Sequence, residues 1–267
     1  MGETVIEVKN LTKRFGKGKA SGAAGEREAA VDHISFELYR GEILGLLGES
    51  GCGKTTLARM LLHLIPPSEG EIFFCGTEIS GMHERKFRKM RSRIQMVYQN
   101  PFDCLDPSWK IKNLLAEPMK IWHPDMSMKE IEAFMIAVLA DCGLGEETLG
   151  KKPGEFSGGQ LQRISIARAL LAKPEVLLAD EIISALDVPI QNQILNLLIR
   201  MKEEYHLTVL FITHDLSVAK KVSDRIMVMQ EGKIKGIGEP ENLLDNSKDP
   251  YIRALAEAVF TFAGNIK

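Results

Sequence analysis

The chain has 267 residues, of which 34 are basic and 36 acidic, a length that predicts one or two domains with a conventional hydrophobic core. The formal net charge of −2 and the pI near 6.3 give no electrostatic reason to expect nucleic acid or anionic lipid as the main partner. Four scattered cysteines favour reduced thiols over a disulfide or zinc framework, and no apolar run approaches the roughly 20 residues that span a bilayer, so a membrane role would depend on partner chains.

The first part of the chain predicts strands, a loop and a helix. Residues 5–8 and 34–38 alternate apolar and polar side chains, as half-buried antiparallel strands do, and residues 17–30 predict a mobile loop between them. Residues 43–47 form a continuous apolar run that stops at a glycine, and residues 57–65 continue as a helix. Strand, glycine loop and helix is the order that a phosphate site needs.

The middle of the chain turns helical between about residues 100 and 154. Ser127 and Glu130 have the spacing of a capping box before an apolar helix at residues 131–139. These features predict a helical subdomain, at about residues 100–160, that is inserted in the core.

Strands and helices alternate again in the last part of the chain. Residues 176–179, 208–212 and 226–229 predict strands, residues 191–205 predict a helix, and residues 240–267 predict a short helical tail. Alternation of this kind predicts an α/β fold with a mainly parallel sheet and helices on both faces.

A phosphate-binding loop joins the strand at residues 43–47 to the helix after it. The pattern G-x-x-x-x-G-K-[ST] is matched by Gly48, Glu49, Ser50, Gly51, Cys52, Gly53, Lys54 and Thr55. The glycines let backbone N–H groups close around phosphate oxygens, and the helix N-terminus adds partial positive charge. We expect Lys54 to reach the β- and γ-phosphates and the Thr55 hydroxyl to ligate Mg²⁺.

Two carboxylates end the apolar strand at residues 176–179. Asp180 suits Mg²⁺ coordination, and Glu181 suits the activation of a water molecule. Apolar strands often end in acids, so the pair alone is weak evidence for these two roles. The evidence becomes strong because the pair follows a further motif that begins at Ser157.

A third motif stands where a helix is predicted to begin. Ser157, Gly158, Gly159 and Gln160 fit a capping box, in which a serine is followed three residues later by a glutamine. A capped helix N-terminus is also a place where an anion binds, so a structural role and a ligand-binding role are compatible.

These motifs, in this order, make the chain resemble the nucleotide-binding subunit of an ATP-binding-cassette (ABC) transporter from about residue 5 to residue 244. The resemblance implies that residues 1–245 form a P-loop NTPase fold, which includes an N-terminal antiparallel β subdomain. It implies a short C-terminal helical tail at residues 246–267. It implies ATP and Mg²⁺ as cofactors. Residues 48–56, which include Thr56, would hold the phosphates, and the residues near Mg²⁺ would be Thr55, Gln99 and Asp180.

The same resemblance assigns roles to single residues. Phe15 would stack on adenine, where the family more often has Tyr, or it would simply pack against the sheet. Gln99 would sense Mg²⁺ and the attacking water, and Glu181 would be the general base. His214 would contact the γ-phosphate, although a lone histidine is more often structural.

Other residues would act in trans, on the nucleotide of a second subunit. Residues 156–160 resemble the signature loop of the family, through which Ser157, Gly158, Gly159 and Gln160 would contact the partner's γ-phosphate. Residues 184–187 would form the D-loop, and Asp187 would also act in trans. Phe156 replaces the usual Leu, and Ile182-Ile183 replaces the usual Pro-Thr, but neither change removes a catalytic group.

Finer features resemble the branch of dipeptide, oligopeptide and nickel importers. Residues 98–102, 105–107 and 117–119 are similar to the region that meets the permease in that branch, and residues 181–188 are similar to the second of its two ATPases. Asp249-Pro250-Tyr251 resembles a tail motif of the branch. No cysteine follows Cys142, which is more typical of the nickel or metallophore subunits than of oligopeptide ones, so peptide, nickel and metal chelate all stay open.

The expected function is therefore ATP hydrolysis that drives an importer. The expected partners are a sister ABC ATPase in a heterodimer, or a second copy in a homodimer, together with two integral membrane permeases and an extracytoplasmic substrate-binding protein. Nucleic acid is not expected, and the chain would be peripheral at the cytoplasmic face of the membrane. The alternatives are a soluble ABC ATPase acting on DNA or ribosomes, and a binding-only regulatory cassette, which the presence of Lys54, Asp180, Glu181 and His214 disfavours.

Overall fold

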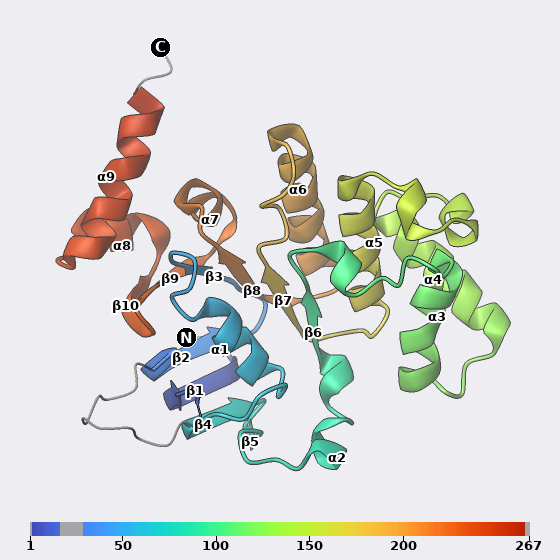
Figure 1. Ribbon diagram of the computed structural model, residues 1–267, viewed down its shortest axis with the longest axis horizontal. Helices are drawn as coiled ribbons and strands as arrows, with labels where there is room; N and C mark the ends of the chain where they lie inside the picture. Colours follow the sequence, from blue (N-terminus) through green and yellow to red (C-terminus); the bar gives the residue numbers. More distant parts are fainter. Residues whose placement is uncertain (1, 17–28, 265–267) are drawn as a thin grey trace. The chain divides into compact units, whose positions relative to one another are not determined.

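The computed structural model describes residues 2–16 and 29–264 (Figure 1). These residues fall into two compact units. The first unit contains Met1–Phe87 and Leu210–Lys267, and the second contains Arg88–Val209. Each unit combines strands with helices, as the α/β prediction requires.

An antiparallel sheet opens the first unit, with the strand order β2-β1-β4-β5. Its strands are β1 (Thr4–Lys13), β2 (Val31–Tyr39), β4 (Glu69–Phe74) and β5 (Thr77–Glu78). In β2 the side chains of Ile34, Phe36 and Leu38 are buried while the residues between them are more exposed, which is the alternation of a strand with one face in the core. The predicted N-terminal antiparallel subdomain is confirmed, and most of the loop predicted at residues 17–30 lies outside the described residues.

The second sheet of this unit carries the phosphate loop. Strand β3 (Ile43–Leu47) is buried along its whole length and runs parallel to β9 (Arg225–Gln230), which pairs in antiparallel fashion with β10 (Lys233–Gly238). Strand β8 (Thr208–Thr213), which enters this unit at Leu210, follows β3 in the strand order. A strand buried on both faces needs a continuous apolar run, which is why residues 43–47 do not alternate.

Helices cover and extend this second sheet. They are α1 (Lys54–Leu61), α7 (Leu216–Val222), α8 (Pro240–Asn246) and α9 (Pro250–Gly264), and a short α2 (Glu84–Phe87) follows the antiparallel sheet. Helix α1 ends earlier than the predicted residue 65, because His63 takes a positive φ of 55°, a conformation that no helix continues through.

The second unit holds the inserted helices and a pair of parallel strands, β6 (Ile94–Val97) and β7 (Val176–Asp180). Its helices are α3 (Ile111–Trp122), α4 (Met128–Asp141), α5 (Gly158–Leu170) and α6 (Val188–Glu204), which contact one another in the order α3, α4, α5, α6. The predicted capping box is present: the Ser127 hydroxyl accepts the Glu130 N–H, and the Glu130 carboxylate accepts the Ser127 N–H at 2.8 Å.

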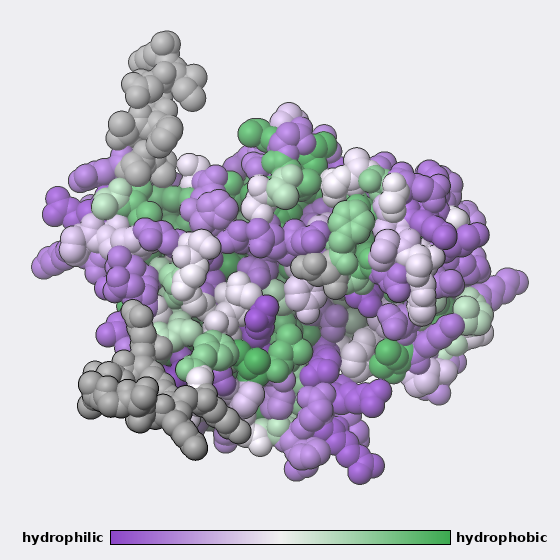
Figure 2. Space-filling model, in the orientation of Figure 1, coloured by the Kyte–Doolittle hydropathy of each residue, from purple (hydrophilic) through white to green (hydrophobic). Residues whose placement is uncertain are grey.

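On the face that Figure 2 shows, hydrophilic residues predominate and apolar residues are interspersed among them. Within the described residues, no helix combines the length and the apolarity that crossing a membrane requires.

Candidate functional site

The phosphate loop is held in shape by its own lysine. The Lys54 Nζ donates to the carbonyl of Gly48 at 2.6 Å and to the carbonyl of Glu49 at 2.8 Å. Lys54 is itself buried and begins α1, so its ammonium lies at the helix N-terminus, where backbone N–H groups already favour an anion. The loop thus brings a fixed positive charge and the N-terminal N–H groups of a helix to one place.

Two loop glycines are required by space and by backbone conformation. A Cβ at Gly48 would collide with the Met229 carbonyl and approach Cys52 Sγ to 2.6 Å. Gly53, the N-cap of α1, has a φ of 109°, and a Cβ there would collide with the Ala30 carbonyl. Larger residues at these positions would push the loop away from the strands that support it.

A pocket of about 350 Å³ opens beside the loop. Its lining comes from the loop itself, the residues just before β2 and the turn between β9 and β10: Ala29, Ala30, Glu49, Ser50, Gly51, Cys52, Gln230, Glu231 and Gly232. Burial raises the pKa of the Cys52 thiol, so at neutral pH this side chain is an uncharged wall of the loop.

Two more predicted residues belong to the same unit. Phe15 follows β1 and exposes 55% of its surface, and the Lys13 Nζ lies 5.4 Å from the centre of its ring. An exposed ring can stack on a base, whereas a ring packed against the sheet would be buried. His214 is exposed between β8 and α7, where the Asp215 carboxylate caps α7 by accepting the Ser217 N–H at 2.8 Å.

The two predicted carboxylates lie in the second unit, at the end of β7. Asp180 is buried, with 7% of its surface exposed, and Glu181 follows it with a φ of 46°. The Gln99 Nε2 donates to Glu181 Oε2 at 3.2 Å and approaches Ser184 Oγ at the same distance. Gln99 and Glu181, which the sequence could only assign separately, are therefore brought together.

Ser184 is a site residue whose role sequence reasoning missed. Its hydroxyl donates to the Glu181 carbonyl at 3.0 Å and accepts from Gln99, so it ties the turn after β7 to the glutamine. The available signal was a small hydroxyl residue three positions after the second acid, which favours a turn that closes on itself.

The apolar pair after Glu181 anchors this turn. Ile182 and Ile183 expose only 2% and 4% of their surfaces, and the Ser184 N–H bonds the Glu181 carbonyl at 3.1 Å. Because the pair is buried, the chain must turn sharply at Glu181, and the left-handed φ of Glu181 is the result.

The signature residues form the predicted cap at the start of α5. The Ser157 N–H donates to Gln160 Oε1 at 3.0 Å, and the Gln160 N–H donates to Ser157 Oγ at 3.4 Å. Ser157, Gly158 and Gln160 are exposed, whereas Gly159 is buried and packs on α6: a Cβ at Gly159 would lie 2.5 Å from Ile190 Cγ2. The exposed end of α5 is thus available to an anion, and Gly159 has a packing role that the sequence did not reveal.

The predicted D-loop leads into α6. Asp187 is exposed at the N-cap of α6, and its side chain makes no capping hydrogen bond. The side-chain Nε2 of Gln191 donates to the Leu186 carbonyl at 2.9 Å. The carboxylate of Asp187 therefore faces outward from the unit.

Two predicted residues, one in each unit, carry side chains of the kind that ligate a magnesium ion shared with phosphate. No group of three or more His, Cys, Asp or Glu side chains suited to a metal occurs within residues 2–16 and 29–264. Mg²⁺ on a nucleotide needs only one or two protein ligands, because phosphate oxygens and water complete its shell. The hydroxyl of Thr55 and the carboxylate of Asp180 are hard oxygen ligands of that kind.

The predicted site residues divide between the two units. The first unit carries Phe15, the loop from Gly48 to Thr56, and His214. The second unit carries Gln99, Asp180, Glu181, Asp187 and the signature residues.

Comparison with known proteins adds the family to this geometry. A family model described as ABC transporter matches residues 31–184. The chain is 45% identical over 260 residues to the oligopeptide transport ATP-binding protein AppF of Bacillus subtilis (strain 168), covering 96% of this chain and 78% of the relative. It is 44% identical over 230 residues to the oligopeptide transport ATP-binding protein OppF of Escherichia coli (strain K12), covering 86% of this chain and 69% of the relative.

A solved structure agrees with these relatives. The ATP-binding cassette MJ0796, described as a dimer in a post-hydrolysis state bound to ADP and Pi, matches with a TM-score of 0.78 and 29% identity. The match covers 88% of this chain and 98% of that one. The sequence motifs, the fold and these relatives agree, and the chain belongs to the ABC transporter family as an ATP-binding cassette.

Proposed function

We propose that the chain is the ATP-binding and ATP-hydrolysing subunit of an ABC importer that takes up peptides. The observation that carries the proposal is the coexistence of an ordered phosphate loop around Lys54 with a Glu181 carboxylate held by Gln99. A binding-only cassette needs the loop but not the acid and glutamine pair. The names of the oligopeptide transport relatives support peptide as the cargo.

The proposed chemistry divides between binding and water activation. The loop amides and Lys54 hold the phosphates and neutralise charge that develops on the γ-phosphoryl group during its transfer. Glu181 accepts a proton from the attacking water, and Gln99 orients that water. His214 contacts the γ-phosphate, and Phe15 stacks on the adenine. Mg²⁺, when bound, supplies positive charge to the β- and γ-phosphates, and Thr55 and Asp180 would hold it.

A second ATPase subunit completes the proposed enzyme. Ser157, Gly158 and Gln160 are exposed at the N-terminus of a 13-residue helix, which suits contact with the γ-phosphate on another subunit. The dimer described for the similar cassette supports this arrangement. We propose a sister ATPase as the partner. The alternative is a homodimer of this chain, and the mass of the complex that forms with ATP would distinguish the two.

The second unit also carries a surface suited to membrane partners. A shallow groove there is lined by Tyr98, Phe102, Cys104, Leu105, Asp106 and Arg168. Phe102 exposes 51% of its surface, and Trp109, also in this segment, exposes 44%. Two integral permeases docking here would act on the segment that leads directly from Gln99, while an extracytoplasmic binding protein would select the cargo. The chain would then be peripheral at the cytoplasmic face of the membrane.

The test is ATP turnover and uptake by the complex reconstituted with its permeases and binding protein. Lys54→Ala should lower ATP hydrolysis by roughly 10²-fold or more, since it removes the charge at the β- and γ-phosphates. Lys86→Ala, which removes an exposed lysine of the same unit, is the matched control and should hydrolyse ATP normally. Unchanged turnover with Lys54→Ala would assign the chemistry to the partner's site alone.

Cargo and partner class are read from the same preparation. Stimulation of ATP hydrolysis by a peptide bound to the binding protein supports the proposal. Stimulation by nickel or a metal chelate, and not by peptide, would identify the metal or the chelate as the cargo. Purification of the chain with ribosomes or DNA instead of permeases would favour a soluble, non-transport ABC ATPase.

A further inference from the structure

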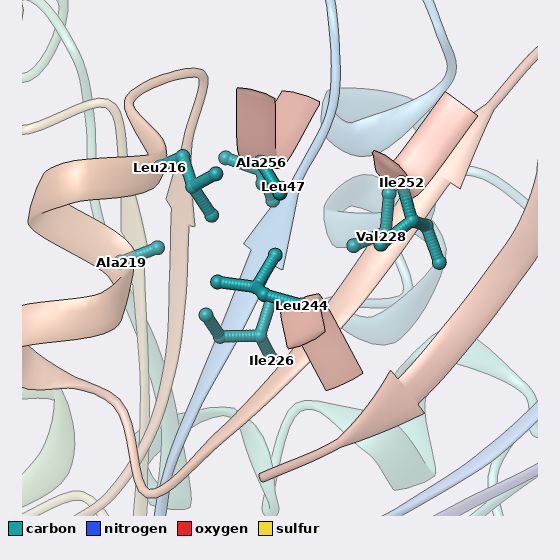
Figure 3. Packing of buried hydrophobic residues seen from close by; sticks show 8 residues of the cluster. All are labelled: Leu47, Leu216, Ala219, Ile226, Val228, Leu244, Ile252 and Ala256. Carbon is teal, nitrogen blue, oxygen red and sulfur yellow. The ribbon is translucent and has the colours of Figure 1, made fainter. Parts of the chain in front are cut away.

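The C-terminal tail packs beneath the strand that feeds the phosphate loop. Ile252 and Ala256 of α9 and Leu244 of α8 are buried in one cluster with Leu47, the last residue of β3 (Figure 3). Leu216 and Ala219 of α7 and Ile226 and Val228 of β9 complete the cluster. Leu47 immediately precedes Gly48, so the tail supports the backbone at the residue before the loop begins.

The motif Asp249-Pro250-Tyr251 fixes where this tail helix starts. The Asp249 carboxylate accepts the N–H of Tyr251 at 2.8 Å and that of Ile252 at 3.3 Å, which is how an aspartate caps a helix. Pro250 occupies the first helical position, where its missing N–H costs nothing. The cap and the buried Ile252 together leave little freedom to the tyrosine between them.

Tyr251 is placed against the phosphate loop. Its side chain packs on the apolar cluster, and its hydroxyl oxygen is buried without a hydrogen-bond partner among the described residues. Burial, followed by the negative charge of Glu49, raises the pKa of Tyr251, and Glu49 stands two residues after Leu47 of the cluster on which Tyr251 packs. A buried hydroxyl without a partner is unfavourable, and a small movement of an exposed glutamate would satisfy it.

Glu49 connects that hydroxyl to the loop. The Glu49 carbonyl accepts from Lys54 Nζ at 2.8 Å and from the Cys52 N–H at 3.3 Å. A contact that fixes the side chain of Glu49 therefore also fixes the carbonyl that orients Lys54.

We propose that Tyr251 is a positioning residue of the nucleotide site: when nucleotide is bound, its hydroxyl donates to the Glu49 carboxylate and holds the phosphate loop in its binding shape. The tail helix then acts as part of the nucleotide site through the loop, without touching the nucleotide. This inference rests on the proposed role of the loop in binding ATP. It differs from a purely structural role, in which only the ring of Tyr251 matters.

The variant Tyr251→Phe separates the two roles, because it keeps the ring in the apolar cluster and deletes the hydroxyl. We expect the dissociation constant for a fluorescent ATP analogue, and the KM for ATP, to rise by about two- to tenfold, the range of one lost hydrogen bond, with a smaller effect on kcat. The Tm of the protein without nucleotide should not fall, since the hydroxyl has no partner to lose.

Tyr205→Phe is the matched control. The Tyr205 hydroxyl, in the second unit, donates to Asp141 Oδ2 at 2.6 Å, so its loss should lower the Tm and leave the affinity for nucleotide unchanged. A double-mutant cycle adds Glu49→Ala: if the two side chains act together, Tyr251→Phe should change affinity little in the Glu49→Ala background.

The outcomes are distinct. Equal affinities of the Tyr251→Phe and unsubstituted proteins, or additive effects in the cycle, would overturn the role of the hydroxyl while leaving the nucleotide site intact. Failure of the unsubstituted protein to bind ATP, or normal binding by Lys54→Ala, would instead refute the proposed function of the loop.

Discussion

At the scale of single residues, the geometry around Glu181 decides what the chain can do. A non-glycine residue with a positive φ costs about 1–3 kcal/mol unless its surroundings compensate. Here the buried Ile182 and Ile183 and the hydroxyl of Ser184 hold the turn, and Gln99 bonds the carboxylate. Strained residues cluster at functional sites. The strain at Glu181, which follows a buried strand, therefore supports its proposed role as the general base.

Replacement of Glu181 by Gln tests that role. The variant keeps the size of the side chain and an oxygen that can accept from Gln99, but it cannot accept a proton. We expect ATP binding to persist and hydrolysis to fall by roughly 10²- to 10⁴-fold, measured as released phosphate in the reconstituted complex. The control Glu203→Gln changes an exposed acid of the same unit and should hydrolyse ATP normally. Near-normal hydrolysis by Glu181→Gln would remove Glu181 from the chemistry.

The sequence predicted the identities of these residues but not their connections. The acid pair and Gln99 follow from motif and resemblance, and the acid pair stands at the end of β7, as the apolar run at residues 176–179 predicted. The bond between Gln99 and Glu181 joins residues far apart in the chain, and the bond of Ser184 depends on a left-handed turn at a residue that is not glycine. Neither is encoded in a local hydrophobic pattern, so neither could be predicted.

At the scale of elements, the start of α5 combines two demands on one sequence. The cap formed by Ser157 and Gln160 fixes where the helix begins, and Gly159 lets its first turn approach α6 at Ile190. The adjacent Gly158 is different, since a Cβ there would meet only Leu186 Cδ2 at 3.4 Å, an ordinary contact distance. The two glycines of one motif thus have unequal structural roles.

This inequality predicts unequal effects of alanine. Gly159→Ala should destabilise the chain by about 1–3 kcal/mol, the usual cost of overpacking, whereas Gly158→Ala should be neutral or slightly stabilising. Urea denaturation of the two variants measures the difference. Ile190→Ala removes the methyl that collides, so it should reduce the cost of Gly159→Ala in the double variant. Equal stability of the two glycine variants would contradict the packing role.

Element boundaries were predictable where a strong local signal exists. The strand at residues 43–47 was predicted with its observed bounds, because a buried strand between a turn and a glycine is a clear pattern. The helix after the phosphate loop was predicted to run to residue 65 from its apolar spacing, but it ends at Leu61. Apolar residues continue past this end, but only Leu62 is buried and Leu64 exposes 49% of its surface, so periodicity alone overestimated the helix.

At the scale of the whole molecule, the N-terminal end of α5 stays exposed in the part of the chain that the structure describes. Its own capping box already satisfies the helix, and yet Ser157, Gly158 and Gln160 remain accessible. The proposed action in trans would account for this exposure, because the same residues would complete a partner's nucleotide site. The chain by itself would then be half of each of two composite sites.

Association driven by ATP tests this division. In the presence of ATP, the chain carrying Glu181→Gln should associate with its sister ATPase, since bound ATP is not consumed and can join the two subunits. Adding Ser157→Arg should abolish this association, because a long cationic side chain would block the approach of the helix N-terminus to the partner's phosphates. The control Ser217→Arg places the same side chain at the exposed start of α7 and should leave association intact.

Light scattering after size-exclusion chromatography, with and without ATP, measures the masses formed. A complex of the Glu181→Gln chain with itself, equally dependent on Ser157, would establish a homodimer in place of the heterodimer. Association that survives Ser157→Arg would mean that the signature residues do not act in trans. In that case the exposed cap of α5 would be only a helix start, and the second half of the nucleotide site would have to come from elsewhere in the partner.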